Sequence, residues 1–474
     1  MIVRIKADFS LILLFICLLV FNPQANVYAA TNAAVISTVG QYEQPFSANS
    51  LWNSRPVNPK FSTYQIPKSV YSPAVQEGNF STGFFLAKSS DRPMIVRGHA
   101  DSKGLWDVDA ESFRSDVTIP HWPADVIPAA GGDGHADIVD PITGVIYSFY
   151  QLRNVGGQWT ATQFAWTALN GRGWGDPAHY FQGSRATGVP AGAGIIRKHE
   201  LNDGDVMYSH ALAMSLTYNA LSNSPEFIFP ATAADHNAST TNSGEIPEGA
   251  LLMLPDTFNI ALLKTPVLKK IAMTLKTYGA YVVDRNYGTP YLIYVENGSG
   301  YKGTWNSLTA ADLELIRQAL RQVTSTSGWI DANDKSFVPQ QNLNMLSMRG
   351  AWQIKSGGEL GVFDTFQQAV VFGSTTAPVT QINTSGRGVS HTSWAMPQKG
   401  KYYMLRAITT GGAKLRLQIF DKQLNQFTFD SKELINGQSI TFLWPSENYQ
   451  PAVTVISGVG SSSTVSGSLT EVLK

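Results

Sequence analysis

The chain has 474 residues, of which 43% are hydrophobic and 15% are charged, and its 35 basic residues balance its 35 acidic ones. Because the sequence contains no basic block or stripe, nucleic-acid binding has little support. The single cysteine, Cys17, lies near the start, so the remainder of the chain excludes thiolate catalysis, cysteine metal sites and disulfides.

Residues 1–29 have the pattern of a secretory signal peptide. A basic start precedes an apolar run over 11–21, and residues that a signal peptidase accepts follow at 27–29. We therefore expect a secreted protein, extracellular or periplasmic, whose mature chain begins near Ala30. The apolar run is about half of the ~20 residues that a membrane-spanning helix needs, and no later segment has such a pattern, so we expect no membrane span.

Short apolar runs between turn residues, with many glycines and aromatics, predict a mainly β protein. Prolines over 45–73 predict an extended arm in which Trp52 is an anchor. Strands are then expected at 84–87, 94–97, 145–152, 159–167, 209–217, 227–230, 249–254 and 281–284. The glycine pair at 156–157 predicts a hairpin between the third and fourth of these strands.

Apolar spacing also predicts two helices. The first covers 260–277, where Pro266 should kink the helix or split off its first turn. The second covers 310–323 and has Thr309 as its N-cap.

Changes in composition and in the spacing of the predicted strands divide the chain into three parts after the signal peptide. Residues 30–325 should form a main β-sandwich, jelly-roll-like, with a few helices, and this is the candidate catalytic domain. Residues 326–344 are a polar, turn-rich linker. Regularly spaced strands predict a smaller C-terminal β-sandwich over 345–474, an accessory domain with carbohydrate binding as its expected role.

The stretch 131–141, GGDGHADIVDP, holds the densest set of chemical groups. In a strand, Asp133, His135 and Asp137 would share one side. When two carboxylates lie beside an imidazole, the pKa of one carboxyl group rises above that of the other, and acid–base catalysis uses such a difference. Three such side chains would also suit a metal ion. We select Asp133 and His135 as catalytic, whereas Asp140 is expected to shape the following turn.

Two further clusters come later in the chain. A glycine-rich loop over 184–197 leads into Arg197, Glu200 and His210, and a polar loop carries Asp235 and His236. The predicted catalytic residues are Asp133, His135, Glu200, His210 and Asp235. The predicted substrate-binding residues are Arg197, Trp52, Trp174 and His236. For each of these residues, a turn, cap or core role is the structural alternative.

Several spaced motifs, DGHADIVDP, GAGIIRKHEL with a later HAL, FPATAAD, PEGALLML and LKTYGAYVVD, resemble a broad family of secreted bacterial β-rich proteins. The resemblance covers about residues 45–300 and departs at Asp137, where a small or apolar residue is expected. It implies a mostly β extracellular protein that is active on carbohydrate, without a family-wide reaction. The positions it points to are Asp133, His135, Arg197, Glu200, His210, Asp235 and Asp284. The C-terminal region is similar to jelly-roll accessory modules of glycan-degrading enzymes.

These observations lead to the hypothesis of a secreted polysaccharide-degrading enzyme, with a glycoside hydrolase favoured. A polysaccharide lyase with a histidine base and Arg197, and a non-catalytic glycan-binding or matrix protein, are the alternatives. We expect a polysaccharide partner, a monomer and no cofactor or metal ligand, with a bound divalent cation such as calcium left open. The sequence lacks the motifs of serine hydrolases, zincins and nucleotide enzymes.

Overall fold

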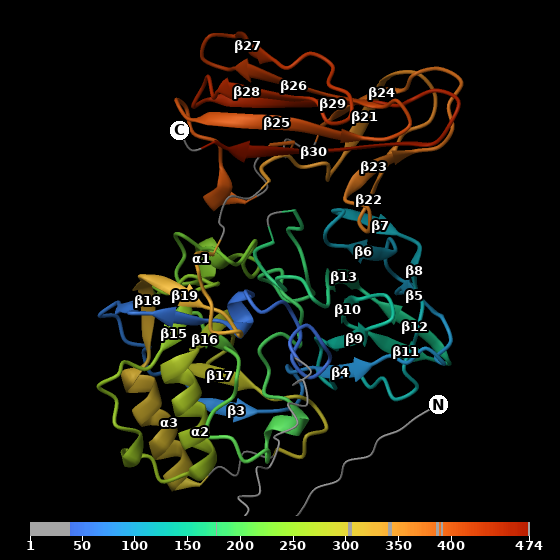
Figure 1. The fold of residues 1–474 in the computed structure, drawn as a ribbon. Coiled ribbons are helices and arrows are strands. Elements are labelled where there is room, and N and C mark those ends of the chain that lie inside the picture. The colour runs from blue at the N-terminus through green and yellow to red at the C-terminus, as the bar shows by residue number, and fades with distance from the viewer. Residues whose placement is uncertain are drawn as a thin grey trace, which may run out of the picture. The chain divides into compact units, whose positions relative to one another are not determined.

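The computed structural model describes residues 38–176, 178–301, 306–339, 344–384, 388–389 and 392–472. The predicted signal peptide lies outside these residues, and the compact unit begins at Thr38. Strands make up 36% of the structure and helices 10%, which confirms the predicted mainly β fold (Figure 1).

A seven-stranded mixed sheet is the centre of the main part of the chain. Its strand order is β2 (Lys60–Phe61), β18 (Arg321–Ser325), β15 (Leu251–Met253), β16 (Ala280–Asn286), β14 (Leu212–Thr217), β17 (Tyr291–Tyr294) and β3 (Ala74–Gln76). Met214 packs toward helices on one face, whereas Ala213 packs into a second core on the other. Because both faces are covered, these strands are almost continuously apolar in sequence.

Two more sheets extend the stack of layers. A six-stranded sheet has the order β4 (Gly83–Leu86), β9 (Ala136–Asp140), β10 (Val145–Tyr150), β13 (Gln163–Ala168), β6 (Leu105–Asp107) and β7 (Ser112–Arg114). A four-stranded sheet has the order β11 (Arg153–Val155), β12 (Gln158–Ala161), β5 (Met94–Gly98) and β8 (Asp116–Ile119). One core joins the six-stranded to the seven-stranded sheet, and another joins it to the four-stranded sheet.

The glycine turn forms a shorter hairpin than the sequence predicts. Gly156 and Gly157 connect β11 to β12, whereas β10 pairs with β13. The predicted strand over 159–167 is therefore two strands in different sheets. The chain changes sheet at Thr162, whose backbone N–H still donates to Tyr150 at 3.1 Å.

The expected linker 326–344 contributes regular structure. It contains β19 (Gly328–Ile330) and β20 (Ser336–Phe337), which form a three-stranded sheet with β1 (Arg55–Val57). This small sheet ties the proline-rich arm to the end of the main part of the chain. The division into domains remains a prediction.

The C-terminal sandwich consists of two five-stranded antiparallel sheets. The first has the order β21 (Trp352–Ser356), β24 (Thr380–Asn383), β29 (Tyr449–Ile456), β26 (Lys414–Asp421) and β27 (Gln426–Asp430). The second has the order β22 (Val362–Asp364), β23 (Ala369–Phe372), β30 (Ser463–Glu471), β25 (Tyr402–Thr409) and β28 (Ser439–Leu443). Inward-facing residues of both sheets, such as Leu417 and Leu469, fill one core.

Helices cover the free face of the seven-stranded sheet. Besides the single turn α1 (Ala238–Thr241), the described helices are α2 (Pro266–Thr277) and α3 (Ser307–Ala319), which contact one another (Figure 1). Pro266 occupies the start of α2, and a separate short helix covers Ile260–Leu262. The predicted split at Pro266 is thus confirmed. Proline suits the first helical turn because its missing N–H would have no partner there.

The second helix begins earlier than predicted. Its N-cap is Asn306, whose side-chain oxygen accepts from the backbone N–H of Thr309 at 2.9 Å, so the predicted cap at Thr309 is wrong. The helix also ends at Ala319, because the next residues join β18. Sheet pairing therefore overrides the helical pattern after residue 319.

We predict that Asn306→Ala lowers the free energy of unfolding by about 1 kcal/mol, because the substitution leaves an N–H of the first helical turn without its acceptor. Urea unfolding followed by circular dichroism measures this change. Ser307→Ala, at the exposed position beside the cap, is the matched control and should change stability by only a few tenths of a kcal/mol. Equal effects of the two substitutions would contradict the assigned cap.

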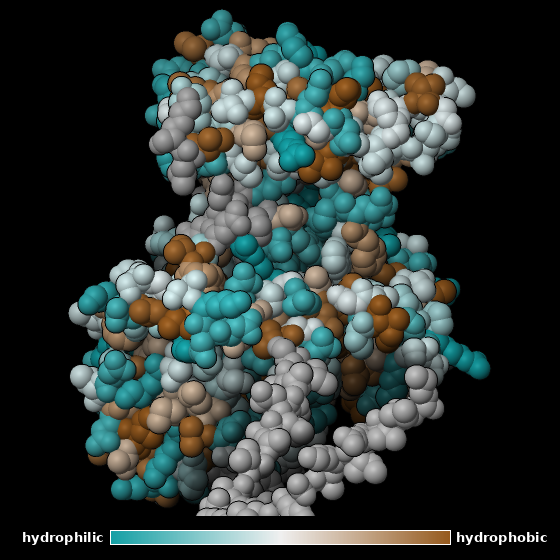
Figure 2. All heavy atoms as spheres, in the orientation of Figure 1, coloured by the Kyte–Doolittle hydropathy of each residue, from teal (hydrophilic) through white to brown (hydrophobic). Residues whose placement is uncertain are grey.

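Hydrophilic and hydrophobic residues are interspersed on the face that Figure 2 presents. Within the described residues, no helix has the length and apolar character needed to cross a membrane.

Candidate active site

A group of polar side chains lies where the six-stranded and seven-stranded sheets meet. Asp133 precedes β9, Tyr150 ends β10, and Asp284 lies in the second half of β16. The glycine-rich loop 184–197 packs between the two sheets, since Val189, Ala193 and Ile195 belong to their shared core. Three segments that are far apart in sequence thus bring titratable groups to one place.

Arg185 is the buried cation of this group. Its Nη1 lies 2.7 Å from Oδ2 of Asp284, and its guanidinium lies 4.1 Å from the ring centroid of Tyr294. Its Nε and Nη2 donate to the backbone oxygen of Ala191. Arg185 is 2% exposed, so its positive charge is held in place beside Asp284.

Asp235 and Asp284 form a carboxyl pair. Burial, the negative charge of Asp284 and a hydrogen bond between the two carboxyl groups raise the pKa of Asp235 to about 7. The backbone N–H of Arg285 donates to Oδ2 of Asp235 at 2.8 Å and holds the carboxyl in place. Because such close carboxylates cannot both ionise easily, a large share of Asp235 keeps its proton near neutral pH.

A third carboxyl group lies behind this pair. Glu248 is fully buried, and its two carboxyl oxygens accept from the backbone N–H of Asp235 at 3.3 and 3.2 Å. Burial and the charges of Asp235 and Asp284 raise the pKa of Glu248 well above its ordinary value. A neutral Glu248 supports the loop that carries Asp235 without adding another charge.

Asp133 completes the acidic group from the side of the six-stranded sheet. The hydroxyl of Tyr150 donates to its Oδ1 at 3.4 Å. Burial and the charge of Asp284 raise the pKa of Asp133. The side chains of Asp235 and Asp284 are 21% and 18% exposed, so water can reach them.

His135 is placed beside this group but is closed off from solvent. It is 3% exposed, and its Nδ1 lies 3.2 Å from the hydroxyl of Ser184. Burial and the positive charge of Arg185 lower the pKa of His135 to about 3. The ring is therefore neutral at physiological pH and orients its neighbours instead of exchanging protons with solvent.

Asp137 and Asp140 are buried structural residues of β9. Oδ2 of Asp137 accepts from the backbone N–H of Gly192 at 2.6 Å, and burial raises the pKa of Asp137 to about 6. Asp140 accepts from the backbone N–H groups of Ile142 and Thr143 and lies 2.9 Å from Nδ1 of His121. The expected turn-shaping role of Asp140 is confirmed.

The predicted residues Glu200 and His210 form a pair of their own. Nε2 of His210 lies 3.1 Å from Oε1 of Glu200, and a backbone N–H from Arg197 donates to the same carboxylate at 2.8 Å. Burial opposes both charges, but their attraction raises the pKa of His210 and lowers that of Glu200. The structure records no direct contact between this pair and Asp133 or Asp235.

The side chain of Arg197 is buried in contacts within the protein. Its Nε lies 2.9 Å from Oε2 of the buried Glu296, and its guanidinium packs on the rings of Tyr42 and Phe84 at 4.6 and 4.2 Å. With 3% of its surface exposed, Arg197 has little access to a polysaccharide. This burial counts against the predicted substrate-binding role.

The two tryptophans predicted to bind substrate are core residues. Trp52 and Trp174 are each 2% exposed, and their rings stack on one another at 5.6 Å. Tyr281 packs edge-on against both. Because protein atoms cover their faces, stacking on a sugar is ruled out for both, which corrects the prediction. The predicted anchoring role of Trp52 agrees with this position.

His236, the last predicted substrate-binding residue, is exposed beside the acidic group. Its backbone oxygen accepts from Nη2 of Arg285 at 2.9 Å. Its imidazole remains available, and its predicted contact with substrate stays a prediction.

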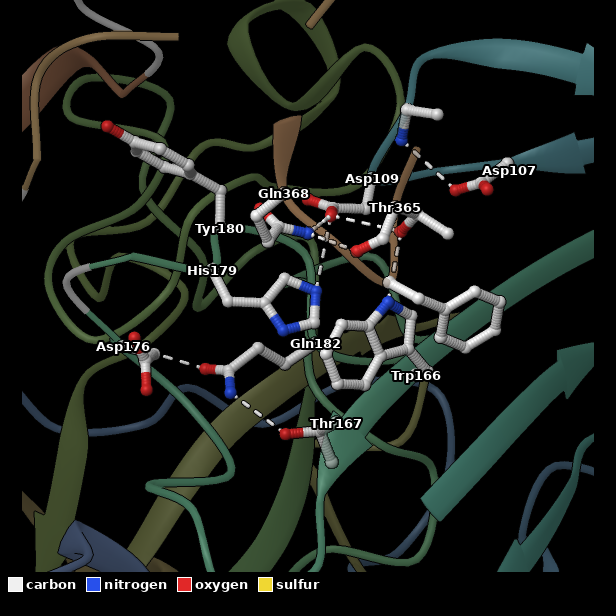
Figure 3. Close-up of polar contacts among 12 residues, drawn as sticks. Asp107, Asp109, Trp166, Thr167, Asp176, His179, Tyr180, Gln182, Thr365 and Gln368 are labelled. Atoms are coloured by element: carbon white, nitrogen blue, oxygen red, sulfur yellow. Dashed lines mark hydrogen bonds and ion pairs between the residues drawn. The ribbon is translucent and has the colours of Figure 1, made fainter. Parts of the chain in front are cut away.

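A separate buried network joins the C-terminal sandwich to the six-stranded sheet (Figure 3). Asp109 lies 2.7 Å from Nη2 of Arg349 and accepts from the Thr365 hydroxyl at 3.1 Å. His179 lies 3.3 Å from Asp109 and packs on the ring of Trp166 at 4.4 Å. Asp109 is fully buried, and its contacts with Arg349 and Thr365 tie the sandwich to the six-stranded sheet.

No group of three or more His, Cys, Asp or Glu side chains in the described part of the chain has an arrangement that could hold a metal ion. The acidic group has instead the features of a proton-transfer site. It combines one carboxyl group that is protonated near neutral pH, one carboxylate beside a fixed arginine, and a third carboxyl group across a tyrosine hydroxyl.

Sequence reasoning identified Asp133 and Asp235 and reached Asp284 only through the family resemblance. It missed Tyr150, Arg185 and Glu248. Arg185 lies within the glycine-rich loop 184–197, which the sequence analysis associated with the site, so its position in that loop could have identified it as a candidate. Glu248 and Tyr150 look like an ordinary loop residue and an ordinary strand residue, and nothing local distinguishes them.

No family model and no curated protein sequence matches the chain. Among solved structures, a chain of the accessory secretory protein 1, 2 and 3 structure from Streptococcus pneumoniae is similar at 13% identity and a TM-score of 0.17, covering 29% of this chain and 99% of that one. A chain of the Glycosylation Associate Protein (Gap123) complex from Streptococcus agalactiae is similar at 16% identity and a TM-score of 0.16, covering 26% and 46%. Likenesses at these scores carry no argument about fold or function.

Proposed function

We propose that this protein is a secreted glycoside hydrolase that acts on a polysaccharide. The observation that carries the proposal is the acidic group itself. Asp235 and Asp284 share a hydrogen bond beside Arg185, and the charge of Asp284 acts on Asp133, which accepts from the Tyr150 hydroxyl. Glycoside hydrolysis needs two carboxyl groups whose pKa values differ, one protonated and one ionised.

The three carboxyl groups take distinct roles in this proposal. Asp235 donates its proton to the glycosidic oxygen as the bond from the anomeric carbon to that oxygen breaks. Asp133 acts as the base that removes a proton from the attacking water, or as the nucleophile, and the anomeric configuration of the first product distinguishes these two routes. Asp284, paired with Arg185, keeps the proton on Asp235 until the substrate oxygen arrives.

The lyase alternative has less support from the same contacts. A lyase needs a histidine base and a cation that face the substrate together. His135 is buried, His210 is paired with Glu200, and Arg197 is paired with Glu296. The non-catalytic alternative gains some support because only Asp133, His135 and Asp235 of the five predicted catalytic residues gather at one place.

An assay on a polysaccharide panel tests the proposal. The purified protein should release reducing ends without a rise in the ultraviolet absorbance of unsaturated uronates. A rise in that absorbance would identify a lyase instead. Neither signal across neutral and acidic polysaccharides would contradict the enzyme proposal and favour a binding protein.

The rate of hydrolysis should fall as pH rises through about 7. The general acid must be protonated to act, and the pKa of Asp235 is raised to about 7, so raising the pH removes the proton that the reaction uses. A pH profile of kcat measures this limb. Asp284→Asn, which removes the negative charge that raises the pKa of Asp235, should move the limb to lower pH, whereas the exposed Glu245→Gln should leave it in place. A limb unaffected by Asp284→Asn would contradict the assignment.

A further inference from the structure

A groove of about 580 Å³ is lined by segments on both sides of the seven-stranded sheet's strand β15 in sequence. Its walls come from the loop at 228–230, the start of β15 and β16, the segment 323–329 and residues 338–339. Ligand-binding pockets in proteins commonly have volumes of about 300–1,000 Å³, so this groove can hold a small ligand or part of a chain.

The chemistry of the groove is neutral. None of its lining residues carries a charge. Its lining combines aromatic rings, among them Phe229 and Trp329, with four successive hydroxyl residues at 324–327. Phe229 and Trp329 are partly exposed, unlike the buried pair Trp52 and Trp174. Rings beside hydroxyl groups suit ligands that have both C–H faces and hydroxyls.

Tyr281 places an unpaired hydroxyl group in the lining of the groove. It lines the groove, it is 2% exposed, and its hydroxyl has no hydrogen-bond partner among the described residues. Buried hydroxyls are usually paired, because leaving one without a partner costs about 1–3 kcal/mol. Burial raises the pKa of Tyr281, so the hydroxyl stays neutral and can both donate and accept.

The groove and the acidic group share their supporting backbone. Gly249 lines the groove and directly follows Glu248, which contacts Asp235. A Cβ at Gly249 would lie 2.3 Å from the backbone oxygen of Ile228, so glycine allows the loop at 228–230 to press onto this strand. The loop that begins in the groove continues to Asp235.

We propose that this groove is a subsite for neutral sugar units and that the protein therefore acts on an uncharged polysaccharide. This inference rests on the proposed hydrolase function and names its substrate class. Trp329 and Phe229 offer ring faces to the sugar, while the hydroxyls of Ser325 and Thr326 bind its hydroxyl groups; those of Thr324 and Ser327 donate to backbone oxygens. The absence of cationic side chains in the lining gives a uronate chain no counter-charge.

Binding to the Asp235→Asn variant, which should not turn over substrate, tests the groove separately from catalysis. Cello-, xylo- and manno-tetraoses are the neutral probes, and tetragalacturonate is the charged comparator, all measured by titration calorimetry. At least one neutral probe should bind, and adding Trp329→Ala should weaken that binding roughly ten-fold or more, which corresponds to about 1.4 kcal/mol. Trp106→Ala, a partly exposed tryptophan outside the groove, is the matched control and should bind as before.

A second variant separates loss of binding from loss of folding. Ser325→Trp adds bulk at an exposed wall residue without removing core contacts, and it should block binding while circular dichroism stays unchanged. Unchanged binding in both Trp329→Ala and Ser325→Trp, stronger binding of tetragalacturonate, or no binding of any probe would each overturn the subsite. Groove-dependent binding without release of reducing ends by the unaltered protein would overturn the hydrolase and leave the subsite standing.

Discussion

Asp235→Asn should reduce kcat for polysaccharide hydrolysis by about 10²–10⁴-fold, the usual contribution of a general acid. The substitution keeps the shape of the side chain and the hydrogen bond from the Arg285 N–H, but it removes the proton that the leaving group needs. Reducing-end assays at pH 6 measure the loss. The melting temperature at pH 6 should stay level, because the amide, like the protonated carboxyl group, carries no charge.

Two results would argue against this role of Asp235. A small change in rate would remove it from the chemistry. A large fall in melting temperature would mark it as a structural residue, whose carboxyl group holds the loop through the Arg285 N–H. Glu245→Gln on the following segment, an exposed carboxylate without this environment, should change neither quantity.

The second large effect is expected on stability. Asp109→Asn should lower the free energy of unfolding by about 3–5 kcal/mol, because it leaves the buried guanidinium of Arg349 without its counter-charge. The unfolding midpoint in urea, followed by tryptophan fluorescence, measures the loss. The double substitution Asp109→Leu with Arg349→Met should recover part of it, since no buried charge is then left unpaired.

An exposed ion pair of the same sandwich provides the comparison. Lys414 and Glu433 lie 2.6 Å apart, but their side chains are 40% and 47% exposed. Breaking this pair should change stability by about 0–1 kcal/mol. Similar losses for the buried and the exposed pair would show that Asp109 does not tie the sandwich to the six-stranded sheet.

The Asp109 network also gives a pH dependence of stability. Burial would raise the pKa of Asp109, but the charges of Arg349 and His179 outweigh it and lower the pKa below its ordinary value. A lowered pKa in the folded state contributes stability above the ordinary pKa of aspartate and loses it as the pH falls. Acid should therefore loosen this network, and the Asp109→Asn variant should be less sensitive to acid than the unaltered protein.

The sequence by itself determined much of the local structure. Alternation of apolar residues marked most strands of the sandwich, and Pro266 marked the start of α2, because both features act within a few residues. Asp133 and Asp235 could be selected because each lies within two residues of a histidine in a loop. The turn at Asp140 could be predicted from its immediate neighbours, Pro141 and Gly144.

Only the tertiary structure decided which of these groups meet. Asp284 lies 99 residues from Arg185 and 49 from Asp235 in sequence, and their contacts depend on how loops cross between two stacked sheets. The burial of each tryptophan could not be predicted from sequence either. Trp52 lies in a core, whereas Trp329 lines the groove. Local pattern specifies the conformation that a residue prefers, whereas its burial and its charged partners come from segments that are distant in sequence.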